Sequence, residues 1–407
     1  MGQYSSYKDS GFEWIGKIPS HWGLLKSKFL WRESFDTSAT GMEDLLSVSQ
    51  YDGITPANGT RSESLVGYKV VEENNLVINI MLAWMGGLGV SAFNGLVSPA
   101  YCVYKLLGNN SPKYMHYLYK TPMYLAEFAR HSTGVIPSRW RMYTDDFGQV
   151  LTLIPPRKEQ DAMVAYLDAA TAKIDEAIAQ QQRMIDLLNE RKQIIVNEMV
   201  TKGLNNEAKF KYSGFNWIGV IPSHWEVKKL KYFINPSREK ANANLPYIGL
   251  ENIESHTGKF ISTDSEYDIS QALLCKKGDV IFGKLRPYLA KAYLADSDYC
   301  CSSEFVVMRD APNPEFLLYV MLSGYFVNKV DASTYGAKMP RADIDYILNL
   351  PIAVPPIEEQ IAIVDKVNMQ FDVIDKMIAP KQKLLDLLQE RKQIIINDVV
   401  TGKIKVI

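Results

Sequence analysis

Residues 187–201 read LLNERKQIIVNEMVT, and residues 387–401 repeat them as LLQERKQIIINDVVT. Both copies keep the charged run Glu-Arg-Lys, and the offset from Leu187 to Leu387 is 200 residues. A single helix in an ordinary globular core has no reason to recur with its charged residues intact. The repeat therefore predicts a chain of two halves that share one plan.

Each copy ends a long helical pattern that starts after a double proline, Pro155 and Pro156 in the first half and Pro355 and Pro356 in the second. Proline suits a first helical turn because its missing N–H would have no partner there. Acidic residues then lie near the positive end of the helix dipole, at Glu159, Glu358 and Glu359. The patterns end at glycines suited to C-terminal caps, Gly203 and Gly402. We therefore expect two helices of roughly forty residues, each about 60 Å long.

Apolar residues along both patterns follow the spacing of seven, with an offset of four, that is typical of coiled coils. The first seam comprises Leu167, Ile174, Ile178, Ile185, Leu188 and Ile195, and the second comprises Val367, Phe371, Ile374, Ile378, Leu385, Leu388 and Ile395. Polar residues that can set register or leave room for a partner interrupt the seams at Gln181, Lys192, Lys381 and Lys392. A helical hairpin inside one globular core is the alternative. The duplication favours two long antiparallel coiled-coil helices.

The composition is that of a soluble globular protein of 407 residues, which is comfortable for two domains. No apolar run approaches the roughly 20 residues of a membrane span, and residues 1–11 lack an apolar signal core. None of the cysteines (Cys102, Cys275, Cys300 and Cys301) forms a Cys-x-x-Cys pair, which argues against a zinc site or a disulfide framework. We expect a cytoplasmic protein. With a net charge of −1, a nucleic-acid binder would have to gather its Lys and Arg residues on one face.

A second repeated block opens each half: residues 10–22 read SGFEWIGKIPSHW, and residues 213–225 read SGFNWIGVIPSHW. His21 and His224 each stand between serine and tryptophan in a block rich in aromatic and aliphatic residues. We therefore interpret both histidines as packing or hydrogen-bonding residues rather than catalytic ones. The blocks are expected to act as latches that seat each domain on a helix end.

The regions between latch and helix, residues 23–153 and 226–353, have diverged strongly. Strands are expected at 76–81, 100–106, 279–282 and 305–308, and helices at 113–131 and 314–330. A polar, glycine-bearing stretch follows each helix, at 132–134 and 333–336. These patterns predict mixed α+β domains.

An alignment of the two regions at an offset of 203 matches Val77 with Val280. It places Met81, Ala83 and Trp84 where the second half has Lys284, Arg286 and Pro287. The two regions therefore share one scaffold but carry different side chains in one loop, as expected of two domains that recognise different targets.

Motifs for catalysis are missing from the sequence. There is no phosphate-binding Gly-x-x-x-x-Gly-Lys-Ser/Thr loop, and the glycine cluster at 86–89 has no acidic residue about twenty positions on. The residues before the double prolines do not fit a DNA-amino methyltransferase motif. Asp145 and Asp146 lack the lysine spacing of a metal-dependent nuclease. By elimination, we expect this chain to recognise a target or to act as a scaffold, with catalysis supplied by other subunits.

The segments 155–160 (PPRKEQ) and 355–360 (PPIEEQ), together with the duplicated ERKQII helix, resemble the specificity subunit of type I restriction-modification enzymes. The match covers essentially the whole chain. Residues 247–253 (YIGLENI) and 278–288 (GDVIFGKLRPY) also look like target-recognition domains of that family. The first region departs from the pattern, with LSVSQY at 46–51 and no Lys or Arg after its strand.

This resemblance implies a non-catalytic bacterial or archaeal subunit for phage defence that reads a bipartite, asymmetric double-stranded DNA target. Two target-recognition domains (23–153 and 226–353) in pseudo-twofold arrangement would be separated by a central helix (154–203) and a C-terminal helix (354–407), with latch segments at 1–22 and 204–225. The helices would bind two methyltransferase subunits, and motor-nuclease subunits are optional further partners. S-adenosylmethionine, ATP and magnesium would belong to those partners, with no cofactor or metal on this chain.

The candidate DNA contacts lie in the loops named above. Arginine can pair bidentately with guanine, and lysine supplies charge to bases or phosphates. In the second region the candidates are Lys284, Arg286, Lys338 and Arg341, and in the first they are Ser132, Thr133, Ser138, Arg139, Arg141, Gln50 and Tyr51. The main rival function is a non-catalytic coiled-coil adaptor without DNA specificity, which predicts no salt-dependent DNA affinity. A self-contained nuclease or methylase is a third alternative that lacks its motifs.

Overall fold

The computed structural model describes residues 2–50, 53–57, 64–136, 139–205, 207–241, 245–263, 271–336 and 338–406. The chain divides into two compact units. Unit 1 comprises Met1–Gln181 and Lys383–Ile407, and unit 2 comprises Gln182–Gln382. Two long helices, α4 (Arg157–Lys202, 46 residues) and α8 (Ile357–Val400, 44 residues), contribute one half each to both units. Within the described ranges, no helix is long and apolar enough to cross a membrane.

The helix halves within each unit run antiparallel. In unit 2, the end of α4 lies beside the start of α8, because a Cβ on Gly203 would come within 2.7 Å of Glu359. Further along, Lys192 Nζ lies 2.5 Å from Asp375 Oδ1. In unit 1, Lys392 Nζ lies 2.6 Å from Asp175 Oδ1. The predicted α+β class with two long antiparallel helices is therefore confirmed.

The predicted seams face inward. The residues buried on them are Leu167, Ile174, Ile185, Ile195, Val367, Ile374 and Leu385. Of the lysines that interrupt the seams, Lys192 and Lys392 have acidic partners, and Lys192 also lies 4.9 Å from the Phe371 ring centroid. Pro380 stands inside α8, a position at which proline removes one backbone hydrogen bond. The seam continues past it to Leu385, so packing maintains the helix there.

Each unit is built on a four-stranded antiparallel sheet. In unit 1 the order is β4 (Trp31–Ser34), β11 (Tyr101–Leu106), β8 (Leu76–Asn79), β9 (Leu88–Val90). In unit 2 the order is β16 (Asn235–Ser237), β22 (Phe305–Arg309), β19 (Val280–Gly283), β20 (Ala292–Leu294). The two sheets share one topology, which shows that the diverged regions keep the same frame.

Smaller sheets complete the units. Unit 1 has β1 (Tyr7–Asp9) with β2 (Lys17–Pro19), β3 (Gly23–Lys26) with β12 (Leu151–Ile154), β5 (Leu46–Ser49) with β6 (Gly53–Pro56), and β7 (Lys69–Val71) with β10 (Gly95–Val97). Unit 2 has β13 (Phe210–Tyr212) with β14 (Val220–Pro222), β15 (Glu226–Lys229) with β23 (Pro351–Val354), and β21 (Tyr299–Cys301) between β17 (Tyr247–Ile248) and β18 (Leu273–Cys275). The strands β12 and β23 lead directly into the double prolines that start α4 and α8.

The helical patterns expected at 113–131 and 314–330 each form two helices. The first is two helices, α1 (Pro112–Tyr119) and α2 (Pro122–His131), because Thr121 caps a new helix through Tyr124 N–H and Pro122 starts it. The second is α5 (Pro314–Leu322) and α6 (Gly324–Asp331), which meet at Ser323. A short helix follows in each unit, α3 (Thr144–Gln149) and α7 (Ile344–Asn349).

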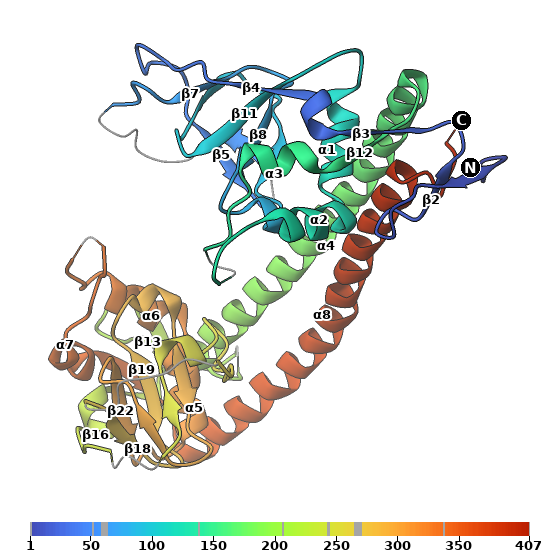
Figure 1. Cartoon of the computed structure of the whole chain (residues 1–407). Helices are drawn as coiled ribbons and strands as arrows, with labels where there is room; N and C mark the ends of the chain where they lie inside the picture. Colours follow the sequence, from blue (N-terminus) through green and yellow to red (C-terminus); the bar gives the residue numbers. More distant parts are fainter. Residues whose placement is uncertain are drawn as a thin grey trace. The chain divides into compact units, whose positions relative to one another are not determined.

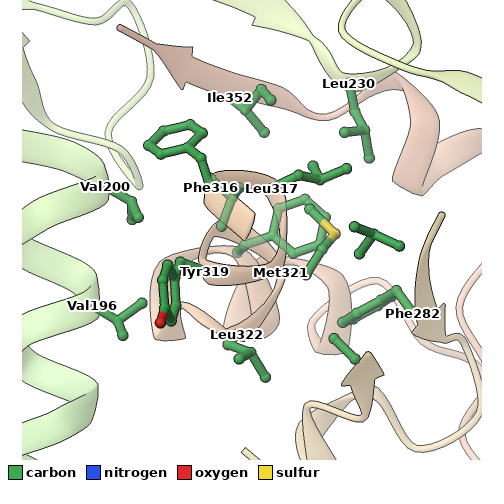
Figure 2. Packing of buried hydrophobic residues seen from close by; sticks show 14 of the residues in the cluster. Val196, Val200, Leu230, Phe282, Phe316, Leu317, Tyr319, Met321, Leu322 and Ile352 are labelled. Atoms are coloured by element: carbon green, nitrogen blue, oxygen red, sulfur yellow. The ribbon is translucent and has the colours of Figure 1, made fainter. Parts of the chain in front are cut away.

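Each core includes the last turns of a long helix. Figure 2 shows Val196 and Val200 of α4 facing Tyr319 and Phe316 of α5 in unit 2. In unit 1 the equivalent residues of α8 are Ile396, Val399 and Val400. Burial of such a side chain stabilises a fold by roughly 1.5–3 kcal/mol. The helix ends are therefore integral parts of the two units.

In both units the repeated block that was predicted as a latch contacts the first turn of a long helix. Glu159, in the first turn of α4, accepts hydrogen bonds from Trp22 Nε1 at 3.1 Å and from the Tyr4 hydroxyl at 3.1 Å, and its other oxygen lies 2.6 Å from His21 Nε2. Burial, and then the neighbouring carboxylate, raises the pKa of Tyr4. The histidine is a hydrogen-bonding residue, as expected.

The latch of unit 2 repeats this arrangement. Glu359 accepts from Trp225 Nε1 at 3.0 Å and lies 2.7 Å from His224 Nε2. In unit 1 the two chain ends lie side by side (Figure 1), because Gly2 and Lys405 exchange backbone hydrogen bonds of 2.8 and 3.2 Å. Each latch thus joins the start of one long helix to the end of the other within its unit.

The sheet register corrects the sequence alignment by one residue. Val77 lies opposite Gly89 and Val103, whereas Ile281 lies opposite Tyr293 and Val307. Val77 is therefore equivalent to Ile281, an offset of 204. The offset of 203 is wrong because apolar strand residues are interchangeable in sequence, and only the hydrogen-bond register fixes their partners.

This register also makes two short 3-10 helices equivalent, η2 (Ala83–Met85) in unit 1 and η6 (Pro287–Leu289) in unit 2. Lys284 consequently stands at the position of Ile80, and Arg286 at the position of Leu82. The inferred change of chemistry remains, since both basic residues still replace apolar ones.

Candidate nucleic-acid interface

The basic residues predicted in unit 2 lie on two loops that the fold brings together. Lys284 and Arg286 follow β19, and Lys338 and Arg341 follow the turn at Gly336. Arg286 N–H donates to Pro340 O at 2.7 Å, and Ala342 N–H donates to Lys284 O at 2.9 Å. We call these two loops the unit 2 reader surface.

Side-chain environments on this surface differ. Arg286 and Lys338 are exposed and Lys284 is half-buried, and none of these cations has an acidic partner within ion-pair distance among the residues with described positions. Arg341 Nη2 lies 2.7 Å from Glu304 Oε1. Its guanidinium therefore anchors the loop, while the other basic groups are available to a ligand.

Two tyrosines accompany the basic residues. Tyr335 is 65% exposed and pairs through its backbone with Arg341. Tyr288 lies in η6 and is 44% exposed. Tyr335 was not among the predicted contacts, although it directly precedes Gly336; the sequence pointed to the basic residues after this turn.

Unit 1 has an equivalent pair of loops, the unit 1 reader surface. Thr133 and Arg141 exchange two backbone hydrogen bonds of 2.9 Å, as Tyr335 and Arg341 do at 3.1 and 3.3 Å. Met142 N–H donates to Ile80 O at 3.0 Å, the counterpart of the bond from Ala342 to Lys284. The predicted residues Thr133, Arg139 and Arg141 are thus brought beside the loop that follows β8.

The other predicted residues of unit 1 have mixed positions. The Ser132 hydroxyl donates to Phe128 O at 2.8 Å and so bonds a carbonyl at the end of α2. Gln50 is half-buried, and its carbonyl accepts from Lys120 Nζ at 2.9 Å, which also bonds Gly86 O at 2.8 Å. Lys120 therefore ties the Gln50 turn to the end of η2. Tyr51 and Ser138 lie outside the described residues.

Sequence reasoning missed Trp140. Its ring lies 5.3 Å from that of Trp84 in an edge-to-face contact, and Trp84 Nε1 donates to Met81 O at 3.2 Å. This aromatic pair joins the two loops of the unit 1 reader surface. The roles of all these residues in binding stay predictions.

Structural roles account for the rejected catalytic motifs. Gly86 ends η2 with φ +89°, and a Cβ on Gly87 would lie 2.7 Å from Leu82 Cβ, so close packing requires these glycines. Asp146 accepts from Tyr143 N–H at 3.2 Å in the first turn of α3. The described ranges hold no cluster of three or more His, Cys, Asp or Glu side chains that could bind a metal ion.

Comparison with known proteins gives consistent matches. Residues 222–386 match the family model of the type I restriction modification DNA specificity domain. The MjaVIII specificity subunit of Methanocaldococcus jannaschii is 27% identical over 281 residues, covering 64% of this chain and 63% of the relative. The EcoDI specificity subunit of Escherichia coli is 24% identical over 260 residues, covering 57% and 58%. The chain spans less than two thirds of the length of these curated relatives.

A solved structure shares the fold. A chain from work on the complex assembly and conformational transition of the type I R-M system matches with a TM-score of 0.64 at 14% identity. The match covers 95% of this chain and 99% of that chain.

Proposed function

We propose that this chain, which is similar to type I restriction-modification specificity subunits, is the non-catalytic subunit that recognises DNA in such a complex. One observation carries the proposal: the two units place different side chains on equivalent loops of the same frame. Two readers of different chemistry fit a bipartite, asymmetric target, with one half-site for each unit.

The unit 2 reader surface has the chemistry of a DNA contact. Arg286 can donate two hydrogen bonds to the major-groove edge of guanine, and Lys284 and Lys338 can neutralise phosphates. The chain carries a net charge of −1, so this local gathering of basic residues supplies the segregation that DNA binding requires. Binding should accordingly weaken steeply with salt.

The long helices carry a duplicated set of exposed apolar residues. On α4, within unit 2, Met184, Leu187 and Ile194 are 45%, 53% and 40% exposed. On α8, within unit 1, the equivalents Leu384, Leu387 and Ile394 are 41%, 51% and 51% exposed. The spacing puts each triad on one helix face. We call these the helix triads.

Two equivalent exposed triads fit two copies of one protein partner, since exposed apolar clusters mark interaction sites. In this function the partners are two methyltransferase subunits, which would carry S-adenosylmethionine. Motor-nuclease subunits that join the complex would carry ATP and magnesium. The triads alone would equally suit a coiled-coil adaptor without DNA specificity, so the DNA experiment below decides between the two functions.

Sequencing of the methylome tests the proposal. Cells expressing this chain with its methyltransferase should gain a methylated motif of two short halves separated by a fixed number of unspecified bases, and cells expressing the methyltransferase alone should not. Exchange of residues 23–153 for those of another specificity subunit should change one half only. Absence of any new motif in the presence of a demonstrably active methyltransferase would favour the adaptor.

A further inference from the structure

The loop after β8 in the unit 1 reader surface is apolar where the equivalent loop after β19 in unit 2 is basic. On the loop after β8, Met81, Leu82 and Met85 are 37%, 37% and 41% exposed. On the adjoining hairpin, Val135 and Ile136 are 95% and 48% exposed. Leu82 stands at the position that Arg286 occupies in unit 2, as the sheet register shows. The equivalent surfaces therefore offer different chemistry to a ligand.

The apolar loop is held in place by its own hydrogen bonds. Leu82 N–H donates to Asn79 O at 3.0 Å, and Gly87 N–H donates to Leu82 O at 2.8 Å. Met81 N–H donates to the buried Asn79 side chain at 3.1 Å, and the Trp84 contact with Trp140 fixes the loop against the hairpin. The backbone thus presents these side chains outward in a defined arrangement.

We propose that unit 1 recognises thymine through apolar contacts with its C5 methyl group. This inference rests on the proposed DNA-reading function. The thymine methyl is the distinctive apolar group that base pairs display in the major groove, and exposed aliphatic side chains are its natural partners. Arg139 and Arg141 on the same surface supply charge for the phosphates beside it. Unit 2, by contrast, recognises bases through hydrogen bonds donated by its basic side chains.

A protein partner is the competing occupant of this patch. The helix triads already provide a matching site in each unit, whereas the apolar residues of the loop after β8 are replaced by Lys284 and Arg286 in the loop after β19. The patch also lies on loops that in unit 2 carry Lys284 and Arg286, so its position follows the DNA reader and not the helices. These two points favour thymine over protein.

Uracil substitution tests the inference, because deoxyuridine lacks only the methyl group. The full chain in complex with its methyltransferase is titrated with a duplex bearing its methylated motif. Thymines are replaced by deoxyuridine in one half-site at a time, except for the thymine opposite the methylated adenine. The half-site of unit 1 is the one that changes when residues 23–153 are exchanged.

Each contacted methyl removed from the unit 1 half-site should weaken binding about four-fold, the effect of losing one buried methyl-sized group. The same replacement in the unit 2 half-site should change the affinity less than two-fold. The double variant Leu82→Ala, Met85→Ala should lose the discrimination between thymine and uracil. Leu25→Ala, which alters an exposed leucine of β3 away from the reader loops, should retain it.

Specific binding of the unmodified duplex with no response to uracil in either half-site would overturn the inference and leave the proposed function standing. A unit 1 half-site with no thymine other than the one opposite the methylated adenine would do the same. Loss of specific binding to every duplex would overturn both. If Leu82→Asp releases the methyltransferase while uracil has no effect, the patch is a protein-docking surface and the inference fails. The substitution in DNA involves no change to the protein, so misfolding cannot produce its result.

Discussion

Trp22 donates its indole N–H to Glu159 at 3.1 Å across 137 residues of sequence. The same bond recurs between Trp225 and Glu359 at 3.0 Å. In both units it links the latch to the first turn of a long helix. The first-turn glutamate therefore does more than complement the helix dipole, because it accepts the hydrogen bonds that seat the latch.

Glu359→Ala should destabilise unit 2 by about 1–3 kcal/mol, because the Trp225 indole N–H would be left buried without its acceptor. Hydrogen exchange, which reports on each unit separately, measures the loss. Glu358→Ala changes an exposed glutamate of the same turn and should have little effect. Equal protection losses in the two variants would contradict the latch.

Gly402→Ala should destabilise unit 1 more than Gly11→Ala. Both glycines have similar φ values, +78° and +79°, so the backbone strain is matched. A Cβ at Gly402 would lie 2.6 Å from Pro19 and 2.9 Å from Trp22, whereas nothing lies within 4 Å of one at Gly11. The clash should add about 1–3 kcal/mol, measurable by denaturant unfolding. Similar losses for the two variants would show that the close approach does not matter.

Arg286→Ala should weaken DNA binding by about 1–3 kcal/mol and relax specificity at one base pair. Lys284→Ala should weaken binding to all sequences and reduce the salt slope by about one. Fluorescence titration of the assembled complex at several salt concentrations measures both effects. Lys277→Ala provides the control, because Lys277 is exposed and precedes β19, at the opposite end of the strand from Lys284. An unchanged affinity in both variants would remove these residues from the interface.

Leu187→Asp should release one of the two methyltransferase subunits, and Leu387→Asp should release the other, because each places a charge in one helix triad. Mass photometry should show complexes with one methyltransferase subunit for each single variant and none for the double variant. Lys173→Asp, at an exposed position of α4 outside the triad, should leave both bound. Retention of two subunits by every variant would contradict triad docking.

Unit 1 should lose stability as the pH falls below about 6.5. Burial, reinforced by the nearby Lys120 and Lys113, lowers the pKa of His116 to about 4. The unfolded chain therefore takes up this proton first, and the loss grows between pH 6.5 and 4 to roughly 3 kcal/mol. His116 accepts from Val90 N–H at 3.1 Å, a bond that His116→Gln can keep. The variant should flatten this part of the pH profile, and an identical profile would refute the assignment.

The sequence by itself determined the repeated plan and the long helices. The apolar seams, double prolines and terminal glycines are local signals, and the long helices of the structure have the residues that these signals name. The duplicated latch also predicted non-catalytic histidines, because His21 and His224 recur in identical apolar settings. Such features are readable since each depends on neighbours in the chain or on an exact duplicate.

Only the tertiary structure decided which residues share a surface. The equivalence of Lys284 with Ile80 depends on hydrogen bonds between strands, and sequence similarity of apolar dipeptides cannot fix that register. Other contacts likewise arise only when the chain folds. They are the hydrogen bond from the Ser132 hydroxyl to α2, the ion pair of Arg341 with Glu304 and the ring contact of Trp84 with Trp140. Local patterns specified the elements, while long-range packing and hydrogen bonding selected the side chains that each reader surface presents.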